Sequence, residues 1–261
     1  MQPKVDSMRP LTRRSTSGQT LWPMNSPVLA PLGLATLLSV GVLAQASQAL
    51  AYLLPGAFLV KRADAALGKR SFQVVLSGRV RTGAGADSSG SVDTPDSIMA
   101  IGARYTFDPK RRFARLAING ADGTKASFVL GSAPEGGPAL MPSHLERLVL
   151  SRLFAQGSVG ALADELRIDL ESRRLGLIGT TVTDVIGGGS PDAAELVLDH
   201  ETSQVLQVSL TERAGRRVRI ELSEWTAGDF GGGGASFPRR IRIYEGGRWV
   251  RDLEAEPPEA L

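Results

Sequence analysis

Apolar and polar side chains alternate through most of this chain from Phe72 onward, on both sides of one helical segment. In residues 72–81 (FQVVLSGRVR), apolar side chains recur at every second position, and most positions between them are polar or basic. A period of two is typical of a β-strand with one buried face. Short turns separate the segments, which favours antiparallel neighbours, because parallel strands need long crossover connections. The sequence therefore predicts a mainly β fold built on an antiparallel sheet.

The alternating segments number about ten. Gly246 and Gly247 stand between two of them, and such a pair is a strong signal for a two-residue hairpin. Pro109 occupies a favoured position in another turn. A polar segment, Thr82–Ser97, is rich in Gly and Ser and is expected to be a loop. The chain shows neither a repeat nor a clear linker between domains, so we predict one domain over residues 52–261.

A helical segment, residues 141–157 (MPSHLERLVLSRLFAQG), interrupts the alternation. Ser143 and Glu146 form an S-x-x-E capping box at its start. Gly157 supplies a stop at its C-terminal end. A second, shorter helix is expected at residues 159–166. The chain thus places helices in the middle of an otherwise strand-rich sequence.

Another helix is predicted near residues 56–68, because Pro55 can begin a helix, apolar side chains follow with helical spacing, and Gly68 can end it. A sheet with one apolar face needs a second layer to cover that face. We therefore predict a single, strongly curved antiparallel sheet. The helices near residues 56–68 and 143–156 should lie against its concave face.

The first 51 residues have the pattern of an export signal. Three arginines within Arg9–Arg14 precede an apolar segment, Val28–Leu43, and small residues follow it. Ala49 and Ala51 form an A-x-A pattern, so cleavage after Ala51 is expected. The mature protein would then begin near Tyr52 in the periplasm or cell envelope.

Two alternatives to this cleavage stay open. Ala44 and Ala46 form a second A-x-A site. The leader can also stay attached as a signal anchor in the inner membrane, since roughly 20 apolar residues suffice to cross a bilayer. Two prolines and two glycines within and beside Val28–Leu43 make a permanent span less favourable than cleavage.

Charge and cysteine content exclude several classes of protein. The net charge of +3 lies in residues 1–51, because residues 52–261 carry 26 basic and 26 acidic side chains. This balance gives no support to nucleic-acid binding. The chain has no cysteine, which excludes disulfides, thiolate metal ligands and a lipid-modified cysteine anchor.

The sequence offers no convincing catalytic or metal-binding motif. His144 and His200 are the two histidines, and they lack the spacing of a metal site. Carboxylates cluster within Asp164–Glu171, a pattern more typical of a solvated helix face than of an acid–base pair. Arginines alternate with apolar residues on the later strands, as expected of an outer sheet face. We therefore predict a protein that is not an enzyme and needs no cofactor or metal.

The C-terminal half, Asp184–Gly247, resembles the LolA/LolB-like superfamily of periplasmic lipoprotein-sorting carriers. The shared pattern is a strand ending in Asp199, a turn with Thr202, and a strand reading GRRVRIELSEW. A Gly-rich loop then precedes Pro238. The leader, the helix after it and the central helices also follow the order of that family. The resemblance covers most of residues 52–250.

The resemblance implies an unclosed antiparallel β half-barrel whose apolar concavity, partly covered by helices, holds the acyl chains of lipoproteins or lipids. It implies a periplasmic carrier that acts in outer-membrane biogenesis, is monomeric, and exchanges cargo with transfer proteins of the inner and outer membranes. An arginine stabilises the closed lid in such carriers, and the sequence assigns no residue to this role. The alternative is an envelope module for structure or protein interaction, with the half-barrel filled by its own side chains.

If a cavity exists, one parity of each strand should line it, because successive side chains point to opposite faces. The capped helix should contribute further side chains from above. The predicted ligand-binding residues are Val74, Leu76, Val80, Met99, Ile101, Tyr105, Phe107, Leu148, Val149, Phe154, Val218, Ile220 and Leu222.

Overall fold

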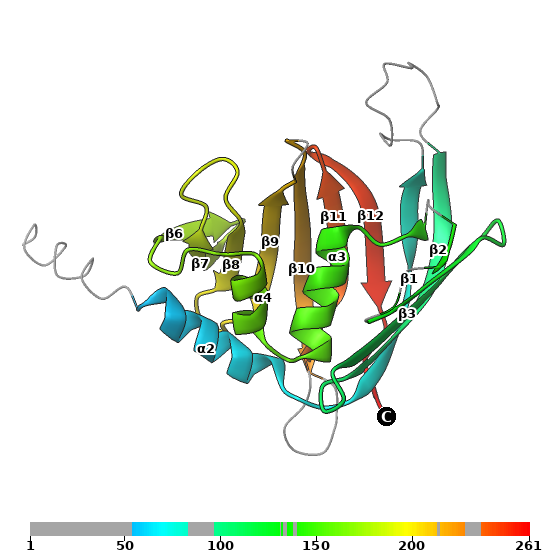
Figure 1. The fold of residues 1–261 in the computed structure, drawn as a ribbon, viewed down its shortest axis with the longest axis horizontal. Helices are drawn as coiled ribbons and strands as arrows, with labels where there is room; N and C mark the ends of the chain where they lie inside the picture. The colour runs from blue at the N-terminus through cyan, green and yellow to red at the C-terminus, as the bar shows by residue number, and fades with distance from the viewer. Residues whose placement is uncertain are drawn as a thin grey trace, which may run out of the picture. The chain divides into compact units, whose positions relative to one another are not determined.

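The alternating segments pair into one antiparallel sheet in the computed structural model of the chain (Figure 1). The structure describes residues 54–82, 97–130, 132, 135–137, 140–212, 215–227 and 236–261. These residues belong to one unit, Leu54–Leu261. The predicted signal peptide, residues 1–51, and its cleavage site lie outside the described residues.

Within the described residues, thirteen strands make up the sheet. In chain order they are β1 (Phe72–Thr82), β2 (Ser97–Asp108), β3 (Phe113–Gly120), β4 (Lys125–Val129), β5 (Glu135–Gly136), β6 (Arg173–Ile178), β7 (Thr181–Gly187), β8 (Glu195–Asp199), β9 (Val205–Thr211), β10 (Arg217–Ala227), β11 (Ser236–Glu245), β12 (Arg248–Ala255) and β13 (Glu259–Ala260).

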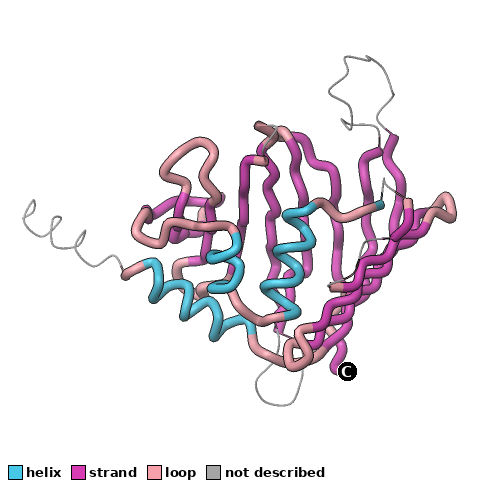
Figure 2. The backbone as a smooth tube through the Cα atoms, viewed as in Figure 1, coloured by secondary structure: helices cyan, strands magenta, loops and turns pink. Residues whose placement is uncertain are grey.

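The described helices are α2 (Gly56–Leu67), α3 (His144–Val149), the π-helix η2 (Leu150–Ala155) and α4 (Val159–Glu165). We refer to α3, η2 and α4 together as the helical lid. Figure 2 shows all of these helices on the same side of the curved sheet. α2 contacts β11 and α4, α3 contacts β10, and η2 contacts β2 and β3.

Neighbouring strands follow the order β5-β4-β3-β2-β1-β12-β11-β10-β9-β8-β7-β6, and β13 adds to β1. Neighbouring strands are antiparallel throughout, and among the described residues the two ends of this order, β5 and β6, do not pair with each other. The prediction of a single open antiparallel sheet with helices on its concave face is confirmed.

The strand count exceeds the predicted ten for local reasons. The segment 174–188 (RLGLIGTTVTDVIGG) counts as one of the predicted ten. In the structure it contains most of the β6–β7 hairpin, because Gly179 adopts a positive φ of 61° and turns the chain. The strands β5 and β13 have two residues each, too few to show a period in the sequence.

The core lies between the concave face of the sheet and the helices. Phenyl rings gather at one place in it, although aromatic residues are only 5% of the sequence. The centroids of Phe154 and Phe237 are 4.7 Å apart, and those of Phe72 and Phe107 are 5.2 Å apart. Since Phe154 belongs to η2 and the other three to strands, this cluster joins the lid to the sheet.

Candidate functional site

The predicted ligand-binding residues all lie in or against one apolar core on the concave face. Strand pairing brings them together: Val74 lies opposite Tyr105, and Val80 lies opposite Met99. Eleven of the thirteen are buried, while Met99 and Leu148 are partly buried and pack against the same core. Their shared face is therefore observed, and their contact with a ligand remains a prediction.

The concave face is packed in this conformation. The eleven buried side chains of the predicted set are at most 6% exposed. Side chains that lined an open cavity would be exposed to it, so the lid and α2 fill the space in front of these strands. An acyl chain would enter only if side chains of the lid moved away from the sheet.

The lid is held in place by caps at its helix starts. Ser143 accepts a hydrogen bond from the Glu146 amide (3.1 Å), which begins α3 as the capping box predicts. Ser158 likewise accepts from the Ala161 amide (3.0 Å) and begins α4. Asp64 of α2 accepts from the first amides of α4, including that of Gly160 at 3.2 Å. This carboxylate ties α2 to the lid.

The middle of the lid is a π-helix rather than the predicted α-helix. The Gln156 amide donates to the Ser151 carbonyl (3.0 Å), five residues earlier. The Ser151 hydroxyl is buried and donates to the Leu148 carbonyl (3.0 Å). The wider turn lets consecutive side chains, Leu153 and Phe154, both reach the core. Such turns are uncommon and occur frequently at functional sites.

A buried polar network connects the lid to the sheet within the otherwise apolar core. Arg251 of β12 donates from Nη1 to Glu146 Oε1 of α3 (3.1 Å). Its Nη2 donates to the carbonyls of Leu140 (3.0 Å) and Met141 (3.3 Å), in the segment that leads into the lid. The Tyr105 hydroxyl of β2 lies 3.4 Å from Glu146 Oε1. We call Tyr105, Glu146 and Arg251 the Arg251 network.

Burial dominates the electrostatics of this network, since the side chains of Arg251 and Glu146 are 5% and 2% exposed. Burial raises the pKa of Glu146, and the positive charge of Arg251 opposes that rise. Burial and the neighbouring carboxylate raise the pKa of Tyr105 above its ordinary value, so the hydroxyl keeps its proton. The guanidinium thus stays charged and binds one oxygen of the lid and two carbonyl oxygens of the segment that leads into it.

The pairing of the two charged members of this network, Glu146 and Arg251, was not predicted from the sequence. The pattern predicts Glu146 as the second half of a capping box, and its carboxylate does accept from the Ser143 amide. The same carboxylate also binds Arg251. The signal for Arg251 was present in the strand pattern. Arg251 shares its parity with Leu253 and Ala255, which are buried, so it is an arginine on the apolar face of a strand.

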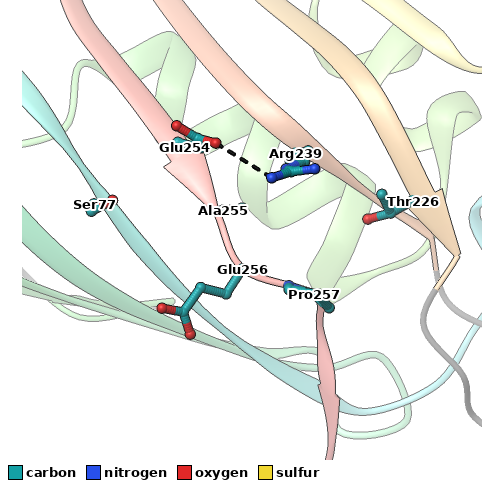
Figure 3. Close-up of a pocket in the computed structure, with 7 residues that line it drawn as sticks. All are labelled: Ser77, Thr226, Arg239, Glu254, Ala255, Glu256 and Pro257. Atoms are coloured by element: carbon teal, nitrogen blue, oxygen red, sulfur yellow. Dashed lines mark ion pairs between the residues drawn. The ribbon is translucent and has the colours of Figure 1, made fainter.

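A hollow of about 440 Å³ lies on the outer face of the sheet (Figure 3). Arg239 and Glu254 form an ion pair across it (3.6 Å), and both side chains are exposed. Charged and hydroxyl groups supply much of its lining, so it does not suit an acyl chain. Its lining residues are Ser77, Thr226, Arg239, Glu254, Ala255, Glu256 and Pro257.

The described residues contain no group of three or more His, Asp or Glu side chains placed to hold a metal ion. His144 is exposed at the start of α3. His200 is exposed as well, and its ring lies 2.9 Å from the buried carboxylate of Asp184. None of the helices in the described ranges is long and apolar enough to cross a membrane.

No protein-family model matches this sequence. No curated protein matches it either. Several solved structures are similar, including the following three. A LolA superfamily protein from Nitrosomonas europaea is 13% identical, with 80% of this chain and 94% of that chain covered and a TM-score of 0.45. A DUF1329 family protein from Desulfovibrio piger is 13% identical, with coverages of 78% and 91% and a TM-score of 0.46.

The third, MucB in complex with MucA(peri), is 12% identical, with coverages of 77% and 92% and a TM-score of 0.27. These likenesses concern the arrangement of the chain and assign it no ligand. The first of these structures comes from the LolA superfamily, and the sequence of this chain resembles that superfamily.

Proposed function

We propose that this protein is a non-catalytic carrier that binds acyl chains of lipids or lipoproteins in the cell envelope. The observation that carries the proposal is the construction of the core. One side is the apolar concave face of a continuous sheet, and the other is a separate helical lid. Buried polar contact between them passes through the Arg251 network.

An acyl chain would bind by replacing side chains of the lid against the sheet. Each methylene that leaves water contributes about 0.8 kcal/mol, so a chain of 14 to 16 carbons contributes on the order of 10 kcal/mol. This gain would offset the contacts that the lid gives up when it moves. Binding of this kind is reversible and needs no chemical step, which suits transfer between partners.

The location and partners follow from the same proposal. The carrier would act in the periplasm after cleavage of the leader, with the mature chain beginning near Tyr52. A signal-anchored form in the inner membrane is the alternative. As a monomer it would receive its cargo from one membrane-bound transfer protein and deliver it to another.

The packed core favours a second candidate, a module for structure or protein interaction. In such a protein the lid never leaves the sheet, and the half-barrel stays filled by its own side chains. The low exposure of the predicted ligand-binding residues is the observation that favours it.

Charge substitution on the concave face separates the two candidates. We would introduce Ile101→Glu and, separately, Leu76→Glu, and measure folding by circular dichroism and binding with a fluorescent fatty acid. A carrier should stay folded and lose binding, because a cavity that opens can hydrate the new charge. A permanently packed core should unfold, because an unpaired buried charge costs several kcal/mol, of order 3–5.

Arg104→Glu is the matched control, since Arg104 lies on β2 with an exposed side chain on the opposite face. It should leave both folding and binding unchanged. Native mass spectrometry of protein purified from the envelope would identify bound lipid directly. Unfolding of both core variants, with the control folded, would reject the carrier in favour of the module.

A further inference from the structure

The tip of the β6–β7 hairpin exposes an unusual amount of apolar surface. Its eight residues, Leu175–Val182 (LGLIGTTV), include no charged side chain. Its four large apolar side chains are between 43% and 71% exposed, and Leu177 is the most exposed of them. In chain order they are Leu175, Leu177, Ile178 and Val182. We call Leu175–Val182 the hairpin tip.

The tip is preformed by backbone pairing. β6 and β7 pair over six consecutive residues, from Arg173 opposite Ile186 to Ile178 opposite Thr181. Leu177 lies opposite Val182, so their side chains share one face of the hairpin. β6 is the last strand in the order of the sheet, and the tip lies at that end of the molecule, beyond the helical lid (Figure 1).

The composition of the tip suits hydrocarbon better than a protein partner. Protein interfaces draw most of their binding energy from Trp, Tyr and Arg. The tip has none of these and consists of Leu, Ile, Val, Gly and Thr. Within the hairpin, backbone groups that face the partner strand are already paired, which lowers the cost of placing them in lipid.

Charge at the base of the hairpin fits the headgroup region of an anionic bilayer. Arg174 and Arg217 both approach the one carboxylate of Glu195, at 2.7 and 4.0 Å. These three side chains together therefore carry a net charge of +1. The side chains of both arginines are about half exposed. Basic side chains beside an apolar insertion are attracted to anionic lipid.

The N-terminal end of the domain lies on the same side. The first residue of α2, Gly56, packs so closely on Leu170 that a Cβ would lie 2.2 Å from the Leu170 carbonyl oxygen. Leu170 is three residues before β6. The first residues of the domain thus lie beside the base of the hairpin.

We propose that the hairpin tip inserts into the surface of a lipid bilayer and orients the protein on it. The aliphatic side chains enter the acyl region, and the pair Arg174 and Arg217 faces the headgroups. This inference does not depend on acyl-chain carriage, since a protein with a permanently closed lid could dock in the same way. A second copy of the chain that pairs along the edge of β6 is the competing occupant.

The full chain allows a local test, because it has no native cysteine. We would label Thr180→Cys, at the tip, with an environment-sensitive fluorophore and add vesicles of phosphatidylethanolamine and phosphatidylglycerol that contain spin-labelled lipid. Arg111→Cys, in the exposed β2–β3 turn, is the matched control. A retained leader would attach beside the hairpin, so its insertion alone would bring position 180 closer to lipid than position 111. The comparison with Leu177→Asp, which leaves residues 28–43 unchanged, therefore isolates the hairpin.

A blue shift and quenching by the spin-labelled lipid at position 180, without either at position 111, would support docking. Adding Leu177→Asp to the labelled chain should abolish the quenching while the protein stays folded. Ile178→Asp is the second variant, should the first fail to fold. Equal probe signals at the two positions would overturn the proposal. So would a blue shift at position 180 that depends on protein concentration and needs no lipid, which would indicate self-association.

Discussion

Removal of the Arg251 guanidinium tests whether the buried network holds the lid on the sheet. Arg251→Met keeps most of the volume of the side chain and deletes its charge. The variant loses the bond to Glu146 and the bonds to the carbonyls of Leu140 and Met141. The buried carboxylate keeps the Tyr105 hydroxyl and the Ser143 amide as hydrogen-bond donors.

The expected cost is about 3–5 kcal/mol of unfolding free energy, the range for breaking a buried ion pair by removing one partner. For a domain of this length, that cost lowers the melting temperature by about 6–20 °C. The loss should also depend on pH. Burial already raises the pKa of Glu146, and without Arg251 nothing positive opposes the rise.

A group with a raised folded pKa contributes stability below its unfolded pKa and loses that stability as the pH rises through the folded value. The Arg251→Met variant should therefore become less stable relative to the wild type as the pH rises from about 5 to about 8. Thermal melts followed by circular dichroism at both pH values would measure this difference.

The double variant Glu146→Met and Arg251→Met is the control, because it removes both charges. It should be more stable than Arg251→Met alone, since a buried carboxylate is no longer left without its partner. A single variant that costs less than about 1 kcal/mol would refute the reasoning. A double variant that is no more stable than the single one would refute it equally.

Three further predictions concern other parts of the domain. Asp64→Ala removes the acceptor at the start of α4 and should cost about 1–2 kcal/mol in urea unfolding; no loss would mean that packing alone positions α4. Bonds from Arg240 and Arg242 lower the pKa of Asp252, so the wild type should be more stable than Asp252→Asn at pH 7. This difference should vanish as the pH falls through the lowered pKa, below about 3.8. A difference in melting temperature that stays constant with pH would contradict this. Gly56→Ala, which would ordinarily favour a helix, should lower the melting temperature because its Cβ would collide with Leu170; a rise would show that α2 can shift.

The face of each strand could be predicted from the sequence because alternation is imposed by the backbone. Val74 and Leu76 point to the core since successive side chains on a strand point to opposite sides, whatever the rest of the fold does. The start of α3 could be predicted for a similar reason. The cap at Ser143 is a local contact between residues three apart.

Features that depend on distant partners could not be predicted in this way. The bond between Glu146 and Arg251 joins residues 105 positions apart, and the sequence contains no local sign of their proximity. The π-helix arises where side chains of one helix fit a particular sheet surface, so its sequence resembles that of an α-helix. The β6–β7 turn at Gly179 and Thr180 lacks the Asn-Gly or Gly-Gly pair that marks most short hairpins.

The position of β1 has a consequence for how the chain acquires its fold. Leu76 lies opposite Ala103 in the next strand of the chain and opposite Ala255 near its far end. Contacts between such distant residues form slowly, because a long loop must close before they add any stability. The sheet is therefore continuous only after β12 has emerged from the ribosome or the export channel. A chain that stopped before β12 would leave β1 and β11 as exposed edges, and we expect it to aggregate rather than to form part of the sheet.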